Sequence, residues 1–304
     1  MRNRRTKTAR IGRRGLWLTI FILLLLPPHM VSAQENGAAP KAEGDDPAAT
    51  ETTTAGEETP GKADERSGDL LTEDGALDLD AAVEYFEDLY RSESSISEAE
   101  LKVVRPDSER TLEMKIWTKG DEKALVVIQG PPREKGTATL KVEDNLWNYL
   151  PRINRTIRIP PSAMLAPWMG SDFTNDDLVR ESSYSEDYTY KIIGMTKDPE
   201  GWLIRFHVKE GVVGLWKRFD LWVSTDGRIP LKSEWYDRKG ELARVLLWDD
   251  VQEMDGKRIP TRMTLIPKDK DEEGHKTIMT YHEIDFGVEI PDRMFSLTHL
   301  ERTR

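Results

Sequence analysis

Carboxylates are the side chains of this sequence whose grouping could support catalysis. Asp176 and Asp177 are adjacent, Asp249 and Asp250 are adjacent, and Asp172 precedes the first pair closely. Two facing carboxylates could cleave a glycosidic bond by acid–base chemistry. Simpler roles also fit, because first-turn acids complement a helix dipole and the second pair would end or kink a strand. A hydrolase remains an alternative, but we predict no catalytic residue and no enzyme.

Metal and nucleophile motifs are missing from the sequence. Beyond the N-terminal region the histidines are His207, His275, His282 and His299, and no two have the spacing of a zinc-binding helix. There is no cysteine, no G-x-S-x-G nucleophile motif and no glycine-rich phosphate loop. We therefore predict neither a metal site nor a cofactor.

Three arginines, Arg152, Arg155 and Arg158, follow one another at steps of three residues. Strand side chains alternate with a period of two, so all three cannot share one face of a regular strand. They form either an exposed basic edge or a partner-docking patch. Residues 1–33 carry an excess of seven positive charges and residues 34–76 an excess of nine negative charges, so the formal total of −11 leaves −9 for residues 77–304. Such an acidic domain makes nucleic acid an unexpected partner.

The stretch 146–178 separates two strand-rich halves of the chain. An aromatic strand ends at Pro151, Pro160-Pro161 prevents further pairing, and an apolar run without strand alternation follows. Thr174 and Asp177 have the spacing of a variant capping box at the start of a short helix. A long apolar excursion of this kind needs something to cover. We predict that it is a mobile lid over a cavity.

Elements on both sides of this stretch must form the cavity. Residues 77–91 have the apolar spacing of a helix, and about eleven strands are expected from residue 100 to 286 with turn signals between them. Alternating residues predict an antiparallel sheet with few helices. Candidate cavity and lid residues are Leu112, Met114, Ile116, Trp147, Met164, Leu165, Trp168, Met169, Phe173, Leu215, Phe219 and Leu221.

The N-terminal region has the composition of an export signal. Seven basic residues precede a short apolar run, and Val31-Ser32-Ala33 supplies small residues for cleavage. We predict a cleaved signal peptide over residues 1–33, by the general secretory or the twin-arginine route; an uncleaved anchor is the alternative. Residues 34–76 are acidic and lack aromatic residues, which predicts a disordered linker before one domain at 77–304.

Three motifs resemble one family. W-x-Y-L-P at 147–151, M-G-S-D-F-T-N-D-D-L at 169–178 and I-P-x-x-x-F-S-L-x-x-L-E at 290–301 are similar to the LolA-like outer-membrane lipoprotein-sorting proteins. The resemblance implies an unclosed antiparallel β-barrel, a half-pipe covered by helices, that holds acyl chains on its concave face. It further implies a periplasmic carrier of lipid or lipoprotein, with a possible inner-membrane exporter and outer-membrane acceptor.

A periplasmic regulator that senses lipids or lipoproteins is an alternative within the same resemblance. Such regulators carry a second domain, for which this chain has little room.

Overall fold

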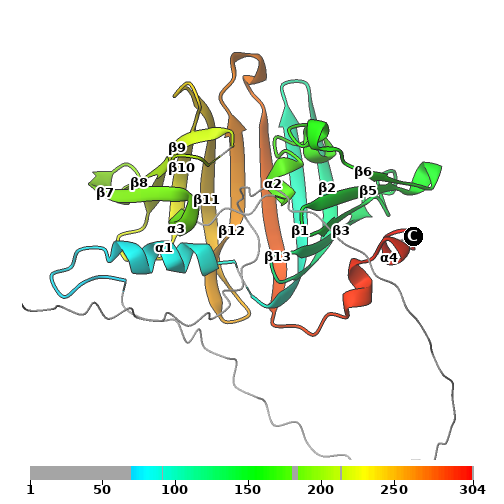
Figure 1. Cartoon of the computed structure of the whole chain (residues 1–304), viewed down its shortest axis with the longest axis horizontal. Helices are drawn as coiled ribbons and strands as arrows, with labels where there is room; N and C mark the ends of the chain where they lie inside the picture. The colour runs from blue at the N-terminus through cyan, green and yellow to red at the C-terminus, as the bar shows by residue number, and fades with distance from the viewer. Residues whose placement is uncertain (1–69, 91, 180–183, 213, 303–304) are drawn as a thin grey trace, which may run out of the picture.

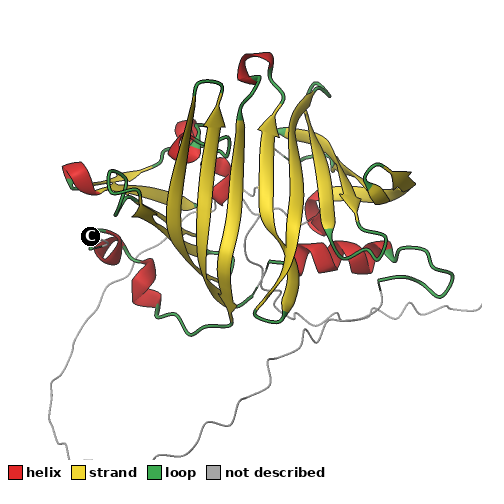
Figure 2. Cartoon of the chain, turned by 180° about the vertical axis from the view of Figure 1, so that it is seen from behind, coloured by secondary structure: helices red, strands yellow, loops and turns green. Residues whose placement is uncertain are grey.

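A single curved sheet forms the body of the protein (Figures 1 and 2). The computed structural model describes residues 70–90, 92–179, 184–212 and 214–302. All thirteen strands pair antiparallel, in the order β6-β5-β4-β3-β2-β1-β13-β12-β11-β10-β9-β8-β7. Strands β6 and β7 are the two free edges, so the sheet does not close. The predicted fold class, an unclosed barrel with few helices, is confirmed.

The strands follow the turn signals of the sequence, and alternating burial gives most of them one inward face. Their bounds are β1 (Ser94–Arg105), β2 (Ser108–Lys119), β3 (Lys123–Gly130), β4 (Ala138–Val142), β5 (Asn145–Leu150), β6 (Arg155–Arg158), β7 (Tyr188–Lys197), β8 (Glu200–Val208), β9 (Trp216–Val223), β10 (Pro230–Asp237), β11 (Leu242–Met254), β12 (Lys257–Pro267) and β13 (Lys276–Phe286).

The chain builds the sheet as two meanders. Strands β1 to β6 form one meander and β7 to β13 the other, and the two meet where β1 pairs with β13 in the middle of the sheet. The segment between β6 and β7 therefore connects the two free edges. We call its described part from Ile159 to Val179 the lid; it contains η2 (Pro161–Ala163), η3 (Trp168–Gly170) and α2 (Asp176–Val179). Another short helix, α3 (Tyr184–Asp187), leads into β7.

Helix α1 (Leu79–Asp88) covers part of the concave face of the sheet (Figure 1). Asp78 caps its N-terminus by accepting a hydrogen bond from the Ala81 amide at 3.2 Å. The helix buries Ala82 and Val83 in the main core, together with side chains of both meanders. The apolar stripe predicted for residues 77–91 thus packs on a sheet, as its spacing requires.

The opposite, convex face is also covered at one end. The segments η5 (Asp292–Phe295) and α4 (Leu297–Leu300) bury Phe295 and Leu300 against Leu125, Leu140 and Tyr149. Strands β3 and β5 consequently carry apolar side chains on both faces. None of the helices within the described ranges is long and apolar enough to span a membrane.

The folded part begins earlier than the predicted boundary at residue 77. Leu70 is buried in the main core, its carbonyl accepts a hydrogen bond from the Asp78 amide at 2.9 Å, and Leu71 forms a bridge with Leu77. Two leucines supply apolar area that the preceding acidic stretch lacks, which explains the earlier start. The predicted signal peptide, residues 1–33, and linker residues 34–69 lie outside the described residues.

Candidate functional site

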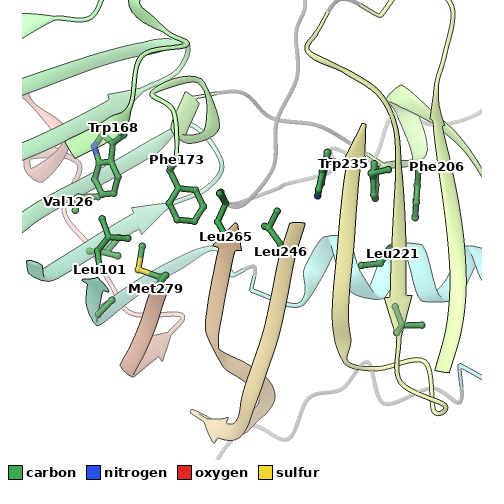
Figure 3. Close-up of a cluster of buried hydrophobic side chains, with 14 of the residues drawn as sticks. Leu101, Val126, Trp168, Phe173, Phe206, Leu221, Trp235, Leu246, Leu265 and Met279 are labelled. Atoms are coloured by element: carbon green, nitrogen blue, oxygen red, sulfur yellow. The ribbon is translucent and has the colours of Figure 1, made fainter. Parts of the chain in front are cut away.

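A cavity lies between the concave face, helix α1 and the lid. It has two compartments that share Phe173 and Asp177 of the lid as lining residues. The larger encloses about 850 Å³ and the smaller about 600 Å³, part of each volume being open to solvent. Figure 3 shows Trp168 and Phe173 pointing from the lid toward the sheet.

The larger compartment is lined mainly by aromatic and aliphatic side chains. Helix α1 and the residues after it, strands β9, β11, β12 and β13, and helix α3 all contribute. These apolar residues are Phe86, Leu89, Tyr90, Tyr184, Leu221, Leu246, Trp248, Met263 and Tyr281. Burial raises the pKa of both Tyr90 and Tyr281, and the neighbouring Tyr281 phenol adds to the rise at Tyr90. Both phenols are therefore neutral at physiological pH, and the Tyr90 hydroxyl donates to the Pro260 carbonyl at 2.8 Å.

The smaller compartment lies under the lid against the first meander. Its wall includes Met114, Ile116, Val126, Leu146, Trp168 and Met279. Lys141 also lines it, yet the Lys141 ammonium is held by the Asp121 carbonyl. This compartment is thus an apolar extension of the first.

One ion pair stands in the wall of the larger compartment. Arg244 Nη1 donates to both carboxylate oxygens of Asp177, at 3.0 and 3.1 Å. The Arg244 guanidinium carbon lies 4.4 Å from the Trp216 ring centre and 5.2 Å from that of Trp235. Arg244 is 8% exposed, so this cation is held in apolar surroundings by one carboxylate and two aromatic rings.

A second ion pair fixes the other end of the same lid motif. Arg105 bridges to Asp172 through Nη1 at 3.1 Å and Nη2 at 3.0 Å, and Nη2 also donates to the Gly170 carbonyl at 3.0 Å. The Thr277 hydroxyl donates to Asp172 at 2.6 Å and accepts from the Asp172 amide at 2.9 Å. The Asp172 carboxylate is therefore well satisfied by sheet residues.

The lid is packed rather than loose, which corrects the expectation of a mobile cover. Trp168 is 2% exposed, and its indole Nε1 donates to the Thr139 hydroxyl at 3.0 Å. The Trp168 amide donates to the Phe173 carbonyl at 2.7 Å. A large aromatic side chain buried in the main core holds the segment in place.

The predicted capping box is confirmed. The Asp177 amide donates to the Thr174 hydroxyl at 3.1 Å, while Asp177 Oδ2 accepts from the Thr174 amide at 2.8 Å. This reciprocal pairing begins α2 and orients the Asp177 carboxylate, which also reaches Arg244. A short local motif therefore positions one charged group of the cavity.

Comparison with known proteins supports this architecture. A family model described as "Uncharacterized protein" matches residues 120–302. The chain belongs to this family. A search of curated proteins found no significant match.

Three solved structures share the fold over nearly their whole length. A DUF1329 family protein from Desulfovibrio piger is 24% identical, with 73% of this chain and 98% of that chain covered and a TM-score of 0.64. A putative outer membrane lipoprotein-sorting protein domain from Vibrio parahaemolyticus is 23% identical, with coverages of 73% and 97% and a TM-score of 0.61. A LolA superfamily protein from Nitrosomonas europaea is 20% identical, with coverages of 72% and 98% and a TM-score of 0.59. The resemblance to LolA-like proteins is thereby confirmed at the level of the fold.

The structure brings five of the twelve candidate cavity residues to the cavity: Met114, Ile116, Trp168, Phe173 and Leu221. Leu112 and Phe219 belong to the main core on the same side but line neither compartment. Met164, Met169 and Leu215 also line neither, and Leu165 is 54% exposed.

Trp147 lies on the wrong side of the sheet for the predicted role. It packs with the convex cluster that contains Tyr149, whereas its neighbour Leu146 lines the smaller compartment. Alternation predicts that neighbours point to opposite faces, but it does not say which face encloses the cavity.

Several wall residues were missed, notably Arg244, Leu246 and Trp248 of β11. These three positions alternate along one strand, so a basic residue on an apolar face was visible in the sequence. An arginine at such a position requires a partner or a function.

The second pair of candidate acids, Asp249 and Asp250, lines neither compartment. Asp249 pairs with Arg262 on adjacent strands, and Asp250 is exposed. Ligand atoms of Asp172, Glu272 and His275 lie within 4.8 Å of one another. Because Arg105 already neutralises Asp172, a cation would face an opposing positive charge there, and we propose no metal site.

The three predicted docking arginines lie together at one free edge. Arg152 is in η1 (Pro151–Ile153), and Arg155 and Arg158 are in the edge strand β6; all three are exposed. Ile153 and Ile157 between them are 58% and 41% exposed. We call these five residues the basic edge.

Proposed function

We propose that this protein is a periplasmic carrier that holds the acyl chains of a lipid or lipoprotein in the cavity and moves them toward the outer membrane. The observation that supports this most directly is the larger compartment, lined by aromatic and aliphatic side chains from the sheet, α1 and the lid. An acyl chain gains about 0.8 kcal/mol for each buried CH₂, so this surface favours such a ligand.

A binding role rather than catalysis fits the two arginine-bound carboxylates of the lid. Asp177 and Asp172 are each paired with an arginine and make further hydrogen bonds. Each of these carboxylates therefore serves as a structural hydrogen-bond acceptor.

The test is binding of a fluorescent acyl lipid to the full chain and to a cavity-filling variant. Met263→Trp replaces an unbranched side chain of the wall by a bulky indole ring and should weaken binding at least fivefold. Ile193→Trp is the matched control, because Ile193 is 45% exposed and lines neither compartment. Native mass spectrometry after mild extraction should detect co-purified lipid. Equal lipid affinity in both variants would contradict the proposal.

Export to the periplasm is proposed from the sequence of residues 1–33. N-terminal sequencing of the periplasmic form should begin at Gln34. A product that retains Met1 and partitions with membranes would show an anchor instead. Residues 34–69 are proposed as a disordered acidic linker, and deleting residues 35–68 should change the melting temperature of the domain little.

The basic edge is proposed as the contact with a membrane-bound partner protein, an exporter or an acceptor. Its positive charge contrasts with the negative domain, and two exposed isoleucines add apolar area. The double variant Arg155→Glu/Arg158→Glu should slow lipid transfer to native membrane vesicles, whereas Arg133→Glu, in an exposed turn, should not. Vesicles treated with protease show whether the partner is a protein or the lipid surface itself. If the partner is a protein, transfer to these vesicles should be slow for the native chain and for every variant.

A further inference from the structure

Arg244 has a hydrogen-bond donor that the fold leaves unused. Its Nη1 group binds Asp177, while Nε is buried and has no acceptor among the described residues. An unsatisfied buried donor is unfavourable, and it is more so when the group carries a charge. Arg244 also lines the larger compartment, where a ligand could reach it.

Arg244 and its partner Asp177 are the charged groups in an otherwise mainly apolar wall of the larger compartment. Trp216 and Trp235 lie beside the guanidinium, and Leu246 and Trp248 follow along the same strand in the cavity wall. A ligand with an acyl chain along this wall would place its head near the arginine. The guanidinium has five N–H donors, so Asp177 at Nη1 does not exhaust its capacity.

We infer that Arg244 anchors the anionic head group of a lipid whose chain occupies the larger compartment. This inference rests on the proposed carrier function and adds the chemical class of the cargo: an acyl or alkyl chain ending in a carboxylate or phosphate oxygen. Hydrogen bonds between charged partners are stronger than neutral ones. The Asp177 carboxylate opposes the incoming anion, so the gain comes from the Arg244 donors that Asp177 does not use. Selectivity for anionic heads should therefore depend on Arg244, whereas affinity for the chain should not.

The experiment compares three ligands of equal chain length on the delipidated full chain. Hexadecanoate, hexadecyl phosphate and hexadecanol compete at pH 7.5 with the neutral fluorescent probe N-phenyl-1-naphthylamine. At least one of the two anionic ligands should bind at least five times more tightly than hexadecanol. Comparing hexadecanoate with hexadecyl phosphate shows whether the site prefers a carboxylate or a phosphate. Arg244→Gln should remove this preference and leave the affinity for hexadecanol within twofold. Arg244→Lys should retain part of it.

Arg262→Gln is the matched control. Arg262 pairs with Asp249 on the adjacent strand, is about half exposed and lines neither compartment, so the variant should behave as the native chain.

Two results would overturn the inference while the carrier function stands. The first is equal binding of all three ligands by the native chain, which needs no folded variant. The second is an Arg244→Gln variant that retains the anion preference or weakens all three ligands alike. Failure of every ligand to displace the probe would instead contradict the proposed function itself.

Discussion

The two arginine-bound carboxylates of the lid differ in how completely their partners are satisfied. At the Asp172 end, Arg105 makes two contacts with the carboxylate and one with the Gly170 carbonyl, and Thr277 completes the site. At the Asp177 end, Arg244 uses Nη1 alone and keeps a buried Nε without an acceptor. Arg244 is also the more buried of the two arginines: 10% of its side chain is exposed, against 24% for Arg105.

This difference indicates that Asp172 and Arg105 position the lid, whereas Asp177 and Arg244 can also bind a ligand. The ion pair of Arg105 and Asp172, whose carboxylate already has several donors, can fix a segment but has no role left for a ligand. An unsaturated pair in an apolar wall retains a donor where an acyl ligand would place its head. The motif at 169–178 is thus held through both carboxylates, but only Asp177 lines the larger compartment.

The largest expected effect tests whether the part of the lid before Asp172 belongs to the core. Trp168→Ala should lower the free energy of unfolding by about 3–5 kcal/mol, because it removes a buried ring and its hydrogen bond to Thr139. Urea denaturation gives the value. Leu165→Ala, at an exposed position of the same lid, should stay within about 0.5 kcal/mol. Similar values for the two variants would mean that the lid does not pack as described.

Removing Asp177 should have the next largest effect. Asp177→Ala leaves Arg244 buried without its carboxylate and removes half of the capping box, for an expected loss of about 3 kcal/mol. Because the cation then lacks a counter-charge, hexadecanoate should raise the melting temperature of this variant more than that of the native chain. Calorimetry with and without the ligand measures both, and an equal shift in the two proteins would argue against an anion at Arg244.

Removing Asp172 should cost less, about 2 kcal/mol. In Asp172→Ala, Arg105 can turn toward solvent because it is partly exposed, although Thr277 loses its acceptor. The same calorimetry should show no ligand-dependent gain beyond that of the native chain. If the ligand raised the melting temperature of Asp172→Ala as much as that of Asp177→Ala, Arg105 and Arg244 would not differ in ligand binding.

The smallest effect concerns pH at helix α3. Burial raises the pKa of Asp187 to about 6, helped by the negative charges of Glu186 and Glu87 and opposed by Lys209. The folded-state pKa lies above the ordinary value, so the stabilisation from protonation is complete below about pH 3.8 and is lost as the pH rises through about 6.

Asp187→Asn should therefore raise the melting temperature at pH 7.5 and give no gain at pH 3.5. Thermal unfolding at the two pH values measures this, with Asp144→Asn in an exposed turn as the control. A gain of equal size at both pH values would exclude titration of Asp187 as the cause.

Features that depend on residues close together in the sequence could be predicted from the sequence. Alternation placed Met114 and Ile116 on one face of their strand, which the structure shows to be the cavity side, and the spacing of Thr174 and Asp177 predicted their reciprocal hydrogen bonds. Strand β6 was missed because four residues, RTIR, show no clear apolar alternation. Its pairing with β5 follows a tight turn in which Asn154 adopts φ 49°.

Long-range partners could not be read from spacing. Arg244 and Asp177 are 67 residues apart, and only the folded sheet brings them together. Trp147 shows the same limit, since its alternation is correct but the identity of the convex face depends on the covering segment at Phe295 and Leu300.

The contact between β1 and β13 has a consequence for how the chain reaches this structure. Every other ladder joins strands that are consecutive along the chain, whereas this one pairs Ser95 with Phe286. Closing so long a loop is entropically expensive, and distant pairings form slowly. Each meander should begin to fold from its own hairpins, and the pairing of β1 with β13 should form late. Until it does, two extra strand edges stay open to neighbouring molecules, so the nascent chain is most prone to aggregation just before its two halves meet.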